Sequence, residues 1–216
     1  GDVLNSKDLE TDYIINYLTP RIKYGRFDLV KSDIEQYRQL ASTAEGFAQL
    51  QAEGKALATD TPQAYLNRIN GLETMANNVL SLSQSLNLRY GSQVDENKKP
   101  IYTPDVINKM IYSASKIADY DVRIPLVNTN LISHSIDTLN ILQSIRETGK
   151  PSIEARDEAL KQINALDTIQ DTKNDLKSEL QDVITLSLRR KQFIEEYNEI
   201  KRNPLNYQER EIDDEP

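Results

Sequence analysis

The one histidine of the sequence, His134, is the side chain best suited to acid–base chemistry. It lies within Ile132-Ser133-His134-Ser135-Ile136, and Asp137 follows three residues later, where a carboxylate could orient the imidazole. No nucleophile motif surrounds this pair, and apolar residues flank it at helical spacing. We therefore interpret His134 as a polar residue beside the apolar stripe of a helix rather than as a general base.

Adjacent carboxylates occur in pairs, including Asp157-Glu158, Glu195-Glu196 and Asp213-Asp214. A glycosidase needs two carboxylates that face each other across a cleft, whereas neighbouring residues of one helix point in different directions. The sequence also has no tryptophan on which a sugar ring could stack. We therefore expect these pairs to be solvated, and we expect no catalytic residue.

The sequence offers no convincing set of ligands for a metal ion or a cofactor. One histidine and no cysteine leave only carboxylates as further ligands for zinc. The seven glycines are scattered and form no phosphate-binding pattern. We expect a protein without metal ion, cofactor or small-molecule substrate, and therefore not an enzyme.

A first basic cluster lies near the N-terminus, where Arg21, Lys23 and Arg26 flank Tyr24. Basic residues interleaved with an aromatic residue can hold phosphates and stack a base. The same residues can form a packed corner between two helices, with ion pairs to nearby carboxylates. We favour the corner, and we keep nucleic-acid binding as the alternative.

A second basic cluster, Arg189-Arg190-Lys191, follows several acidic residues in the same segment. Charges of both signs along a helix are typical of a solvated or partner-facing surface. Arginine and aromatic residues supply much of the energy of protein interfaces, so we expect the aromatic residues of both clusters to be exposed. The candidate interaction residues are Arg21, Lys23, Tyr24, Arg26, Arg189, Arg190, Phe193 and Tyr197.

The composition favours a helical protein with a large solvated surface. Hydrophobic residues make up 38% and charged residues 28% of the 216 residues, and the net charge is −8. An acidic chain disfavours electrostatic binding to nucleic acid. The absence of cysteine excludes disulfides and suits a cytosolic or virion protein. No apolar run approaches the ~20 residues that a membrane span needs.

Apolar residues recur three and four positions apart, and alternating β-branched runs are absent, which predicts an all-α fold. Pro20 is expected to stop the first helix, a capping box at Ser42 and Glu45 to open the third, and Thr61 to cap the fourth. Gly71 predicts close packing. The predicted helices cover residues 6–18, 26–40, 43–53, 62–86, 104–118, 126–145 and 152–203, with an exposed loop at 91–100 and a break at 119–125.

Residues 152–203 contain no glycine or proline. A continuous helix of this length would extend roughly 75 Å. Lys173 and Arg190 interrupt its apolar seam, which argues against a strict two-stranded coiled coil. We expect an elongated helical bundle in which the first half of this helix packs on the preceding helices and the second half projects toward a partner. The predicted segments are 1–92, 101–203 and an acidic tail at 204–216.

Two segments carry a resemblance to known proteins. The first is Tyr17-Leu18-Thr19-Pro20-Arg21-Ile22-Lys23-Tyr24-Gly25-Arg26, continued by Ala41-Ser42-Thr43-Ala44-Glu45-Gly46-Phe47, and the second is Tyr197-Asn198-Glu199-Ile200-Lys201-Arg202-Asn203-Pro204. They resemble helical parts of very large multidomain proteins of tailed phages, namely the large polyvalent proteins and the internal cargo proteins of crAss-like gut phages. This resemblance implies a piece of a longer protein that is packaged in the capsid or tail and delivered with the genome.

Such phage proteins can contain a virion RNA polymerase, but no Asp-x-Asp-x-Asp loop occurs here. We therefore expect a non-catalytic structural or cargo segment that is made in the bacterial cytoplasm, lies in the virion, and contacts copies of itself or other virion proteins during assembly or genome ejection. The alternatives are a cytosolic coiled-coil scaffold or adaptor, and an accessory non-catalytic domain of a large nucleic-acid enzyme.

Overall fold

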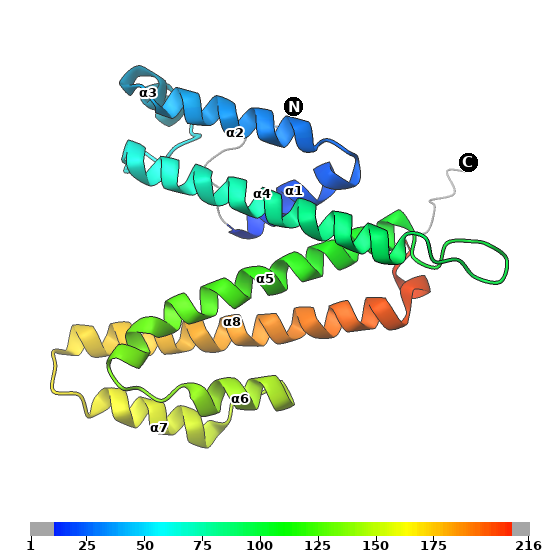
Figure 1. The fold of residues 1–216 in the computed structure, drawn as a ribbon. Coiled ribbons are helices and arrows are strands. Elements are labelled where there is room, and N and C mark those ends of the chain that lie inside the picture. The colour runs from blue at the N-terminus through cyan, green and yellow to red at the C-terminus, as the bar shows by residue number, and fades with distance from the viewer. Residues whose placement is uncertain (1–10, 209–216) are drawn as a thin grey trace, which may run out of the picture. The chain divides into compact units, whose positions relative to one another are not determined.

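The fold of the chain, seen in a computed structural model, is all-α, as predicted (Figure 1). The structure describes residues 11–208, apart from the side chains of residues 11–14 and of Lys23, and this part of the chain contains no β-strand. The helices are α1 (Thr11–Lys23), α2 (Phe27–Ala41), α3 (Ala44–Ala52), α4 (Pro62–Tyr90), α5 (Pro104–Ser133), α6 (Leu139–Thr148), α7 (Ile153–Asn164) and α8 (Gln170–Arg202), and a 3-10 turn follows at Pro204–Tyr207.

The chain divides into two compact units. The first unit contains the described residues up to Ser115 and those from Glu199 onward, and the second unit contains Lys116–Asn198. The boundaries fall within α5 and α8, so each of these helices contributes to both units. The segments 1–92, 101–203 and 204–216 were predicted as consecutive stretches of the sequence, and this division stays a prediction.

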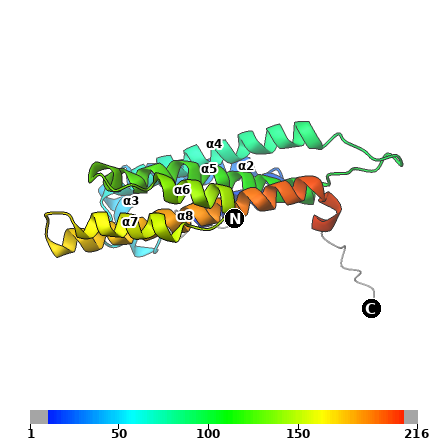
Figure 2. The same ribbon diagram turned by 90° about the horizontal axis from the view of Figure 1, so that it is seen from below.

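The core of the first unit forms where α2 packs against α3 and α4, and α1 packs against α4. Its buried residues include several aromatic side chains, and the rings of Phe47 and Tyr65 meet edge-to-face at 6.0 Å. Thr61 caps α4 as predicted, because its hydroxyl accepts a hydrogen bond from the Ala64 amide at 3.1 Å. The residues of the loop 91–100 are exposed, also as predicted, and Figure 2 shows the loop extending beyond the end of α4.

Three local predictions in the first unit are wrong. Pro20 does not stop α1, since its exposed position leaves the carbonyl that its missing N–H would bond open to water. Thr43, not Ser42, caps α3, because its hydroxyl accepts from the Gly46 amide at 3.0 Å while Ser42 lies at the end of α2. A Cβ atom on Gly71 would meet nothing within 4 Å, so no neighbouring element approaches closely enough to require a glycine at this position.

The second unit is built from the second half of α5, α6, α7 and most of α8. Its core is aliphatic and consists of Leu131, Ile136, Ile141, Ile145, Ala159, Ile163, Leu176, Leu180, Val183 and Ile184. The predicted break at 119–125 is wrong, because α5 continues through Pro125. The predicted helix over 126–145 is also wrong, since α5 ends at Ser133. Just after this end, Ser135 has φ +60°, and the Ile136 amide donates to the Leu131 carbonyl at 3.0 Å. Together they end the helix in the way that a C-terminal glycine usually does, although no glycine is present.

A long C-terminal helix is confirmed, but it begins at Gln170 and not at Ser152. Residues 165–169 separate α7 from α8, and Figure 1 shows the chain turning at this point. The break lets Ile163 and Leu166 pack on the same core as Leu176. The Nζ atom of Lys173 donates to the Asn164 carbonyl at 2.8 Å, which satisfies a backbone acceptor at the end of α7.

The second half of the predicted long helix does not project away from the fold. Leu180, Val183 and Leu186 are buried in the second unit, and Ile200 is buried in the first. The Tyr102 hydroxyl donates to the Lys201 carbonyl at 2.7 Å within the first unit. This part of the helix is therefore integrated into the fold because its apolar residues recur at the positions that face the core.

Candidate protein-interaction site

The first basic cluster forms the corner between α1 and α2. The Arg21 guanidinium lies 3.5 Å from the centroid of the Tyr17 ring and donates to the Tyr17 carbonyl at 2.8 Å. Tyr24 is exposed to 72%, and Arg26 is exposed where α2 begins. The side chain of Lys23 lies outside the described residues. Arg21 is thus turned back onto its own helix, whereas Tyr24 and Arg26 face solvent.

The corner depends on a tight helix ending. Gly25 has φ +69°, a left-handed backbone conformation that residues with a side chain rarely adopt. The Arg26 amide donates to the Arg21 carbonyl at 2.7 Å and so closes the end of α1. Nearby, the Tyr17 hydroxyl donates to Asp33 at 2.9 Å, which ties α1 to α2. Burial, and then this carboxylate, raise the pKa of Tyr17 well above its usual range, so the hydroxyl keeps its proton.

The second basic cluster divides over two sides of α8. Arg189 is exposed, whereas the Arg190 Nε donates to Asp121 of α5 at 2.6 Å and forms an ion pair with it. Lys191 donates from Nζ to the Arg146 carbonyl at 2.8 Å. These two contacts connect α8 to α5 and to α6.

The aromatic residues of this cluster are not fully exposed, which corrects the expectation from the sequence. Phe193 is half-buried and stacks on the buried Tyr120, with 6.1 Å between ring centroids, and Tyr197 is also half-buried. The buried Lys116 lies 5.5 Å from the Phe193 ring and 5.6 Å from the Tyr120 ring. Phe193 therefore packs against α5 within the second unit, because its ring contacts both Tyr120 and Lys116.

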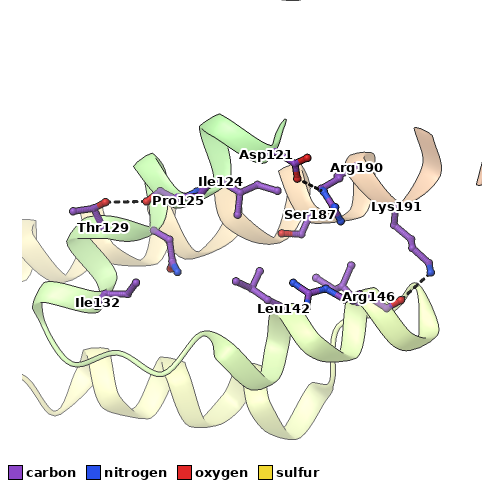
Figure 3. Close-up of a pocket in the computed structure, with 12 residues that line it drawn as sticks. Asp121, Ile124, Pro125, Thr129, Ile132, Leu142, Arg146, Ser187, Arg190 and Lys191 are labelled. Carbon is purple, nitrogen blue, oxygen red and sulfur yellow. Dashed lines mark hydrogen bonds and ion pairs between the residues drawn. The ribbon is translucent and has the colours of Figure 1, made fainter. Parts of the chain in front are cut away.

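A groove of about 460 Å³ lies between α5, α6 and α8 in the second unit (Figure 3). Its volume is in the range of ligand-binding sites. The apolar part of its wall comes from Ile124, Pro125, Ile132, Leu142 and Ile145, and the polar part from Asp121, Asn128, Thr129, Arg146, Ser187, Arg190 and Lys191. Among these lining residues, only Arg190 and Lys191 belong to the basic clusters that the sequence shows.

One polar atom in the groove wall has no hydrogen-bond partner. Ser187 is 9% exposed, and its Oγ atom is buried without a partner. Asn128 is also buried, but its Oδ1 atom accepts from the Thr138 hydroxyl at 3.0 Å. A buried hydroxyl without a partner is costly. Ser187 thus brings to the groove lining a buried hydroxyl whose hydrogen-bonding capacity the described residues do not satisfy.

The charge of the groove is positive. Arg190 uses Nε for Asp121, and Arg190 of α8 and the exposed Arg146 of α6 both line the groove (Figure 3). Asp121 is the one carboxylate of the lining. Three cationic side chains against one anionic side chain favour an anionic ligand, and arginine forks fit carboxylates well.

Exposed apolar residues continue from the groove along α5. Val122, Leu126 and Ile132 are exposed to 63%, 69% and 61%. Together with Pro125 and Thr129 they follow the spacing i, i+3, i+4, i+7 and i+10, which places them on one face. We name these five residues the α5 apolar face. It extends over about 15 Å of helix, and Pro125, Thr129 and Ile132 belong to both the face and the groove.

The first unit has a second hollow of about 400 Å³, lined by α2 and α4. Its main charged groups are already paired, because Arg38 contacts Glu35 at 2.9 Å and also forms a short ion pair with Glu73. These two carboxylates raise the pKa of Arg38 by hydrogen bonding, with Glu73 contributing most. Acidic and basic side chains are equal in number in the lining of this hollow, whereas basic side chains outnumber the one carboxylate in the lining of the groove.

His134 and Asp137 form hydrogen bonds with different parts of the backbone. His134 lies just after α5, and its Nδ1 atom is 2.8 Å from the Asn130 carbonyl. The Asp137 carboxylate accepts from the Leu139 amide at 3.1 Å and so helps to start α6. The structure therefore gives Asp137 a capping function and does not bring it to the imidazole.

Within residues 11–208, no group of three or more histidine, cysteine, aspartate or glutamate side chains is arranged to hold a metal ion. None of the helices in this range combines the length and the apolar character that a membrane crossing requires. Comparisons with protein-family models, with curated proteins and with solved structures find no match to this chain.

Proposed function

We propose that this chain is a non-catalytic helical segment that works through contacts between proteins, with copies of itself or with neighbouring proteins of an assembly. The observation that carries this proposal is the α5 apolar face, Val122, Pro125, Leu126, Thr129 and Ile132, which lies exposed beside the basic groove. Contiguous exposed apolar residues with polar groups at the rim are characteristic of interaction sites.

The setting that we propose is the virion of a tailed phage, with the segment acting as structural or cargo protein during assembly or genome ejection. Two features support this setting. The segments Tyr17–Arg26, Ala41–Phe47 and Tyr197–Pro204 resemble helical parts of large phage proteins. The net charge of −8 also limits adhesion to packaged DNA through repulsion between like charges.

The proposed contact can be tested by cross-linking. A photoreactive amino acid at Leu126 is irradiated in cells that make the protein together with its natural neighbours. We expect discrete protein adducts, because Leu126 is 69% exposed on the α5 apolar face. The matched control is a photoreactive residue at Leu88, which is 84% exposed on α4 but lies outside this face.

Two results would overturn the proposal. One is the absence of adducts at position 126, combined with a single-chain mass in light scattering up to the highest soluble concentration. The other is an adduct pattern that is the same from positions 126 and 88. For the virion setting, mass spectrometry of purified phage particles must detect the chain in the particle interior, and its absence there contradicts that setting.

A further inference from the structure

The groove of the second unit has three features that describe its ligand. Its rim carries Arg146, Arg190 and Lys191 against the single carboxylate of Asp121. Its wall contains the Ser187 hydroxyl, which is buried without a partner. Apart from Asn128 and Thr129, the remaining wall is built from branched apolar side chains and a proline. A ligand that satisfies all three has negative charges beside a branched apolar group.

The two guanidinium groups set the position of the negative charges. The Arg190 Nε donates to Asp121, which holds the guanidinium in place in the groove lining and leaves its terminal nitrogens out of this bond (Figure 3). Arg146 comes from the last turn of α6, and its backbone carbonyl is fixed by Lys191. Two arginines from different helices, one of them held by an ion pair, suit two carboxylates a short distance apart, as in an acidic peptide.

The apolar wall explains why charge alone does not define the ligand. Ile124, Ile132 and Leu142 offer a surface against which one aliphatic side chain can be removed from water. Burial of such a side chain adds affinity that salt does not screen, whereas the contacts with the arginines weaken with salt. A peptide with one branched aliphatic residue between carboxylates combines both contributions.

The sequence of this chain contains such a peptide. Residues 211–215 read Glu-Ile-Asp-Asp-Glu, so one isoleucine is flanked by four carboxylates. We propose that the groove of the second unit binds residues 211–215 of a second copy of this chain, with carboxylates on Arg146 and Arg190 and with Ile212 on the apolar wall. This inference rests on the proposed function, since it names a partner for the contact region.

The first test measures peptide binding directly. A variant that lacks residues 209–216 is titrated with a fluorescent peptide of that sequence, and binding is followed by anisotropy. We expect saturable binding that weakens with salt and falls about tenfold or more in Arg146→Glu and in Arg190→Glu, because each change places a negative charge opposite a carboxylate. The matched control is Arg189→Glu, which makes the same change on α8 at an exposed residue outside the groove lining.

Changes in the peptide keep the test valid even where a protein variant fails to fold. Ile212→Ser in the peptide is expected to weaken binding about tenfold through lost apolar burial, and replacement of its acidic residues by their amides is expected to abolish it. No binding, equal binding of the serine peptide, or an equal loss in Arg189→Glu overturns the assignment of the groove.

A second measurement identifies the source of the peptide. By light scattering, we expect the full chain to form dimers or larger species and the variant that lacks residues 209–216 to have the mass of one chain. If the full chain has the mass of one chain and yet blocks the added peptide, the same molecule occupies its own groove, and the second copy is excluded. If position 126 still yields adducts in the shortened variant although no peptide binds, the proposed function stands and this inference fails.

Discussion

The two units of the chain bury aromatic side chains to different extents, and Tyr120 is the one buried aromatic residue among the described residues of the second unit. In the first unit, tyrosines contribute to the core, including Tyr37, Tyr65, Tyr90 and Tyr102, and the rings of the last two lie 4.7 Å apart. The core cluster of the second unit is entirely aliphatic. A buried tyrosine brings a hydroxyl that requires a local partner, whereas an aliphatic core makes no such demand.

The two units also differ in where some of their polar groups lie. In the first unit, hydroxyl groups connect elements internally, as in the bond from Tyr17 to Asp33 and that from Tyr102 to the Lys201 carbonyl. In the second unit, Arg146, Ser187 and Arg190 gather along the groove. Arg68, Asn108 and Ser115 of the first unit also have a buried atom without a partner, but none of them lines either of the described hollows. Both the groove and the α5 apolar face, on which the proposed function rests, belong to the second unit.

The largest predicted effect tests the aliphatic core. Leu176 is fully buried in the second unit, so Leu176→Ala should lower the free energy of unfolding by about 3 kcal/mol, through lost burial and the cavity that remains. Hydrogen exchange should show faster opening of α6 and α7, with little change in α2. The control Ile153→Ala removes a side chain that is 77% exposed in the same unit and should have an effect below about 0.5 kcal/mol. Equal loss of protection in α2 would mean that the two units open together.

The second prediction uses the tyrosines of the first unit at alkaline pH. Burial, opposed by the charge of Arg68 and assisted to a lesser extent by Asp60, raises the pKa of Tyr65 to about 12. Because the pKa is raised in the folded state, the stabilisation is fully present below about pH 10, the pKa of an unfolded tyrosine, and is lost as the pH rises through about 12.

The measurement is urea unfolding at pH 8 to 11.5 for the natural chain and for Tyr65→Phe. The loss of stability with pH should be smaller in Tyr65→Phe by roughly 2 kcal/mol or less, and the difference should be detected in the exchange of α4 rather than of α6. Tyr17→Phe is a second variant in the same unit, since the pKa of Tyr17 is also raised by burial. Identical pH profiles for Tyr65→Phe and the natural chain would show that this tyrosine does not distinguish the units.

The sequence predicted the fold class and several helix starts because these depend on local chemistry. Thr61-Pro62 and Thr103-Pro104 each combine a hydroxyl acceptor with a proline in the first turn, and both begin helices. The break between α7 and α8 contains no glycine or proline and was missed. Its local signal is weak, since Asn164, Asp167 and Thr168 are only modest helix formers. The burial of Ile163 and Leu166 on a shared core determines it instead.

The candidate site was less predictable than the fold, because its residues come from three helices. Arg190 and Lys191 were identified from their charge, but Asp121 lay in the segment that was predicted as a break before Pro125. A proline inside a helix is usually interpreted as an end, and here that interpretation concealed the periodic spacing of Val122, Leu126 and Ile132. The missing partner of Ser187 is a property of packing that no sequence pattern reveals.

The third prediction compares one helix cap from each unit. Ser152→Ala and Thr61→Ala should each lower the free energy of unfolding by about 1 kcal/mol, since each hydroxyl accepts a bond from an amide of its first helical turn. The glycine variants should lose only a few tenths, because glycine leaves the cap amides open to water. Thermal unfolding measures all four variants. A negligible effect of Ser152→Ala would contradict the start of α7 at Ile153 and would favour a helix that begins earlier.

The smallest effects distinguish a structural ion pair from one that also serves recognition. Glu73→Gln in the first unit and Asp121→Asn in the second each weaken a partly exposed arginine–carboxylate pair, so each should lower stability by less than about 1 kcal/mol, and the loss should shrink in salt. Their effects on binding should differ. Asp121→Asn removes the one negative charge of the groove lining and should strengthen binding of the peptide of residues 209–216 about two- to fivefold.

The control Glu73→Gln should leave binding of this peptide unchanged, because Glu73 lies in the other unit and pairs with Arg38. Weaker binding in Asp121→Asn would show that the fixed orientation of Arg190 matters more than the net charge of the groove, and the two ion pairs would then have the same structural function.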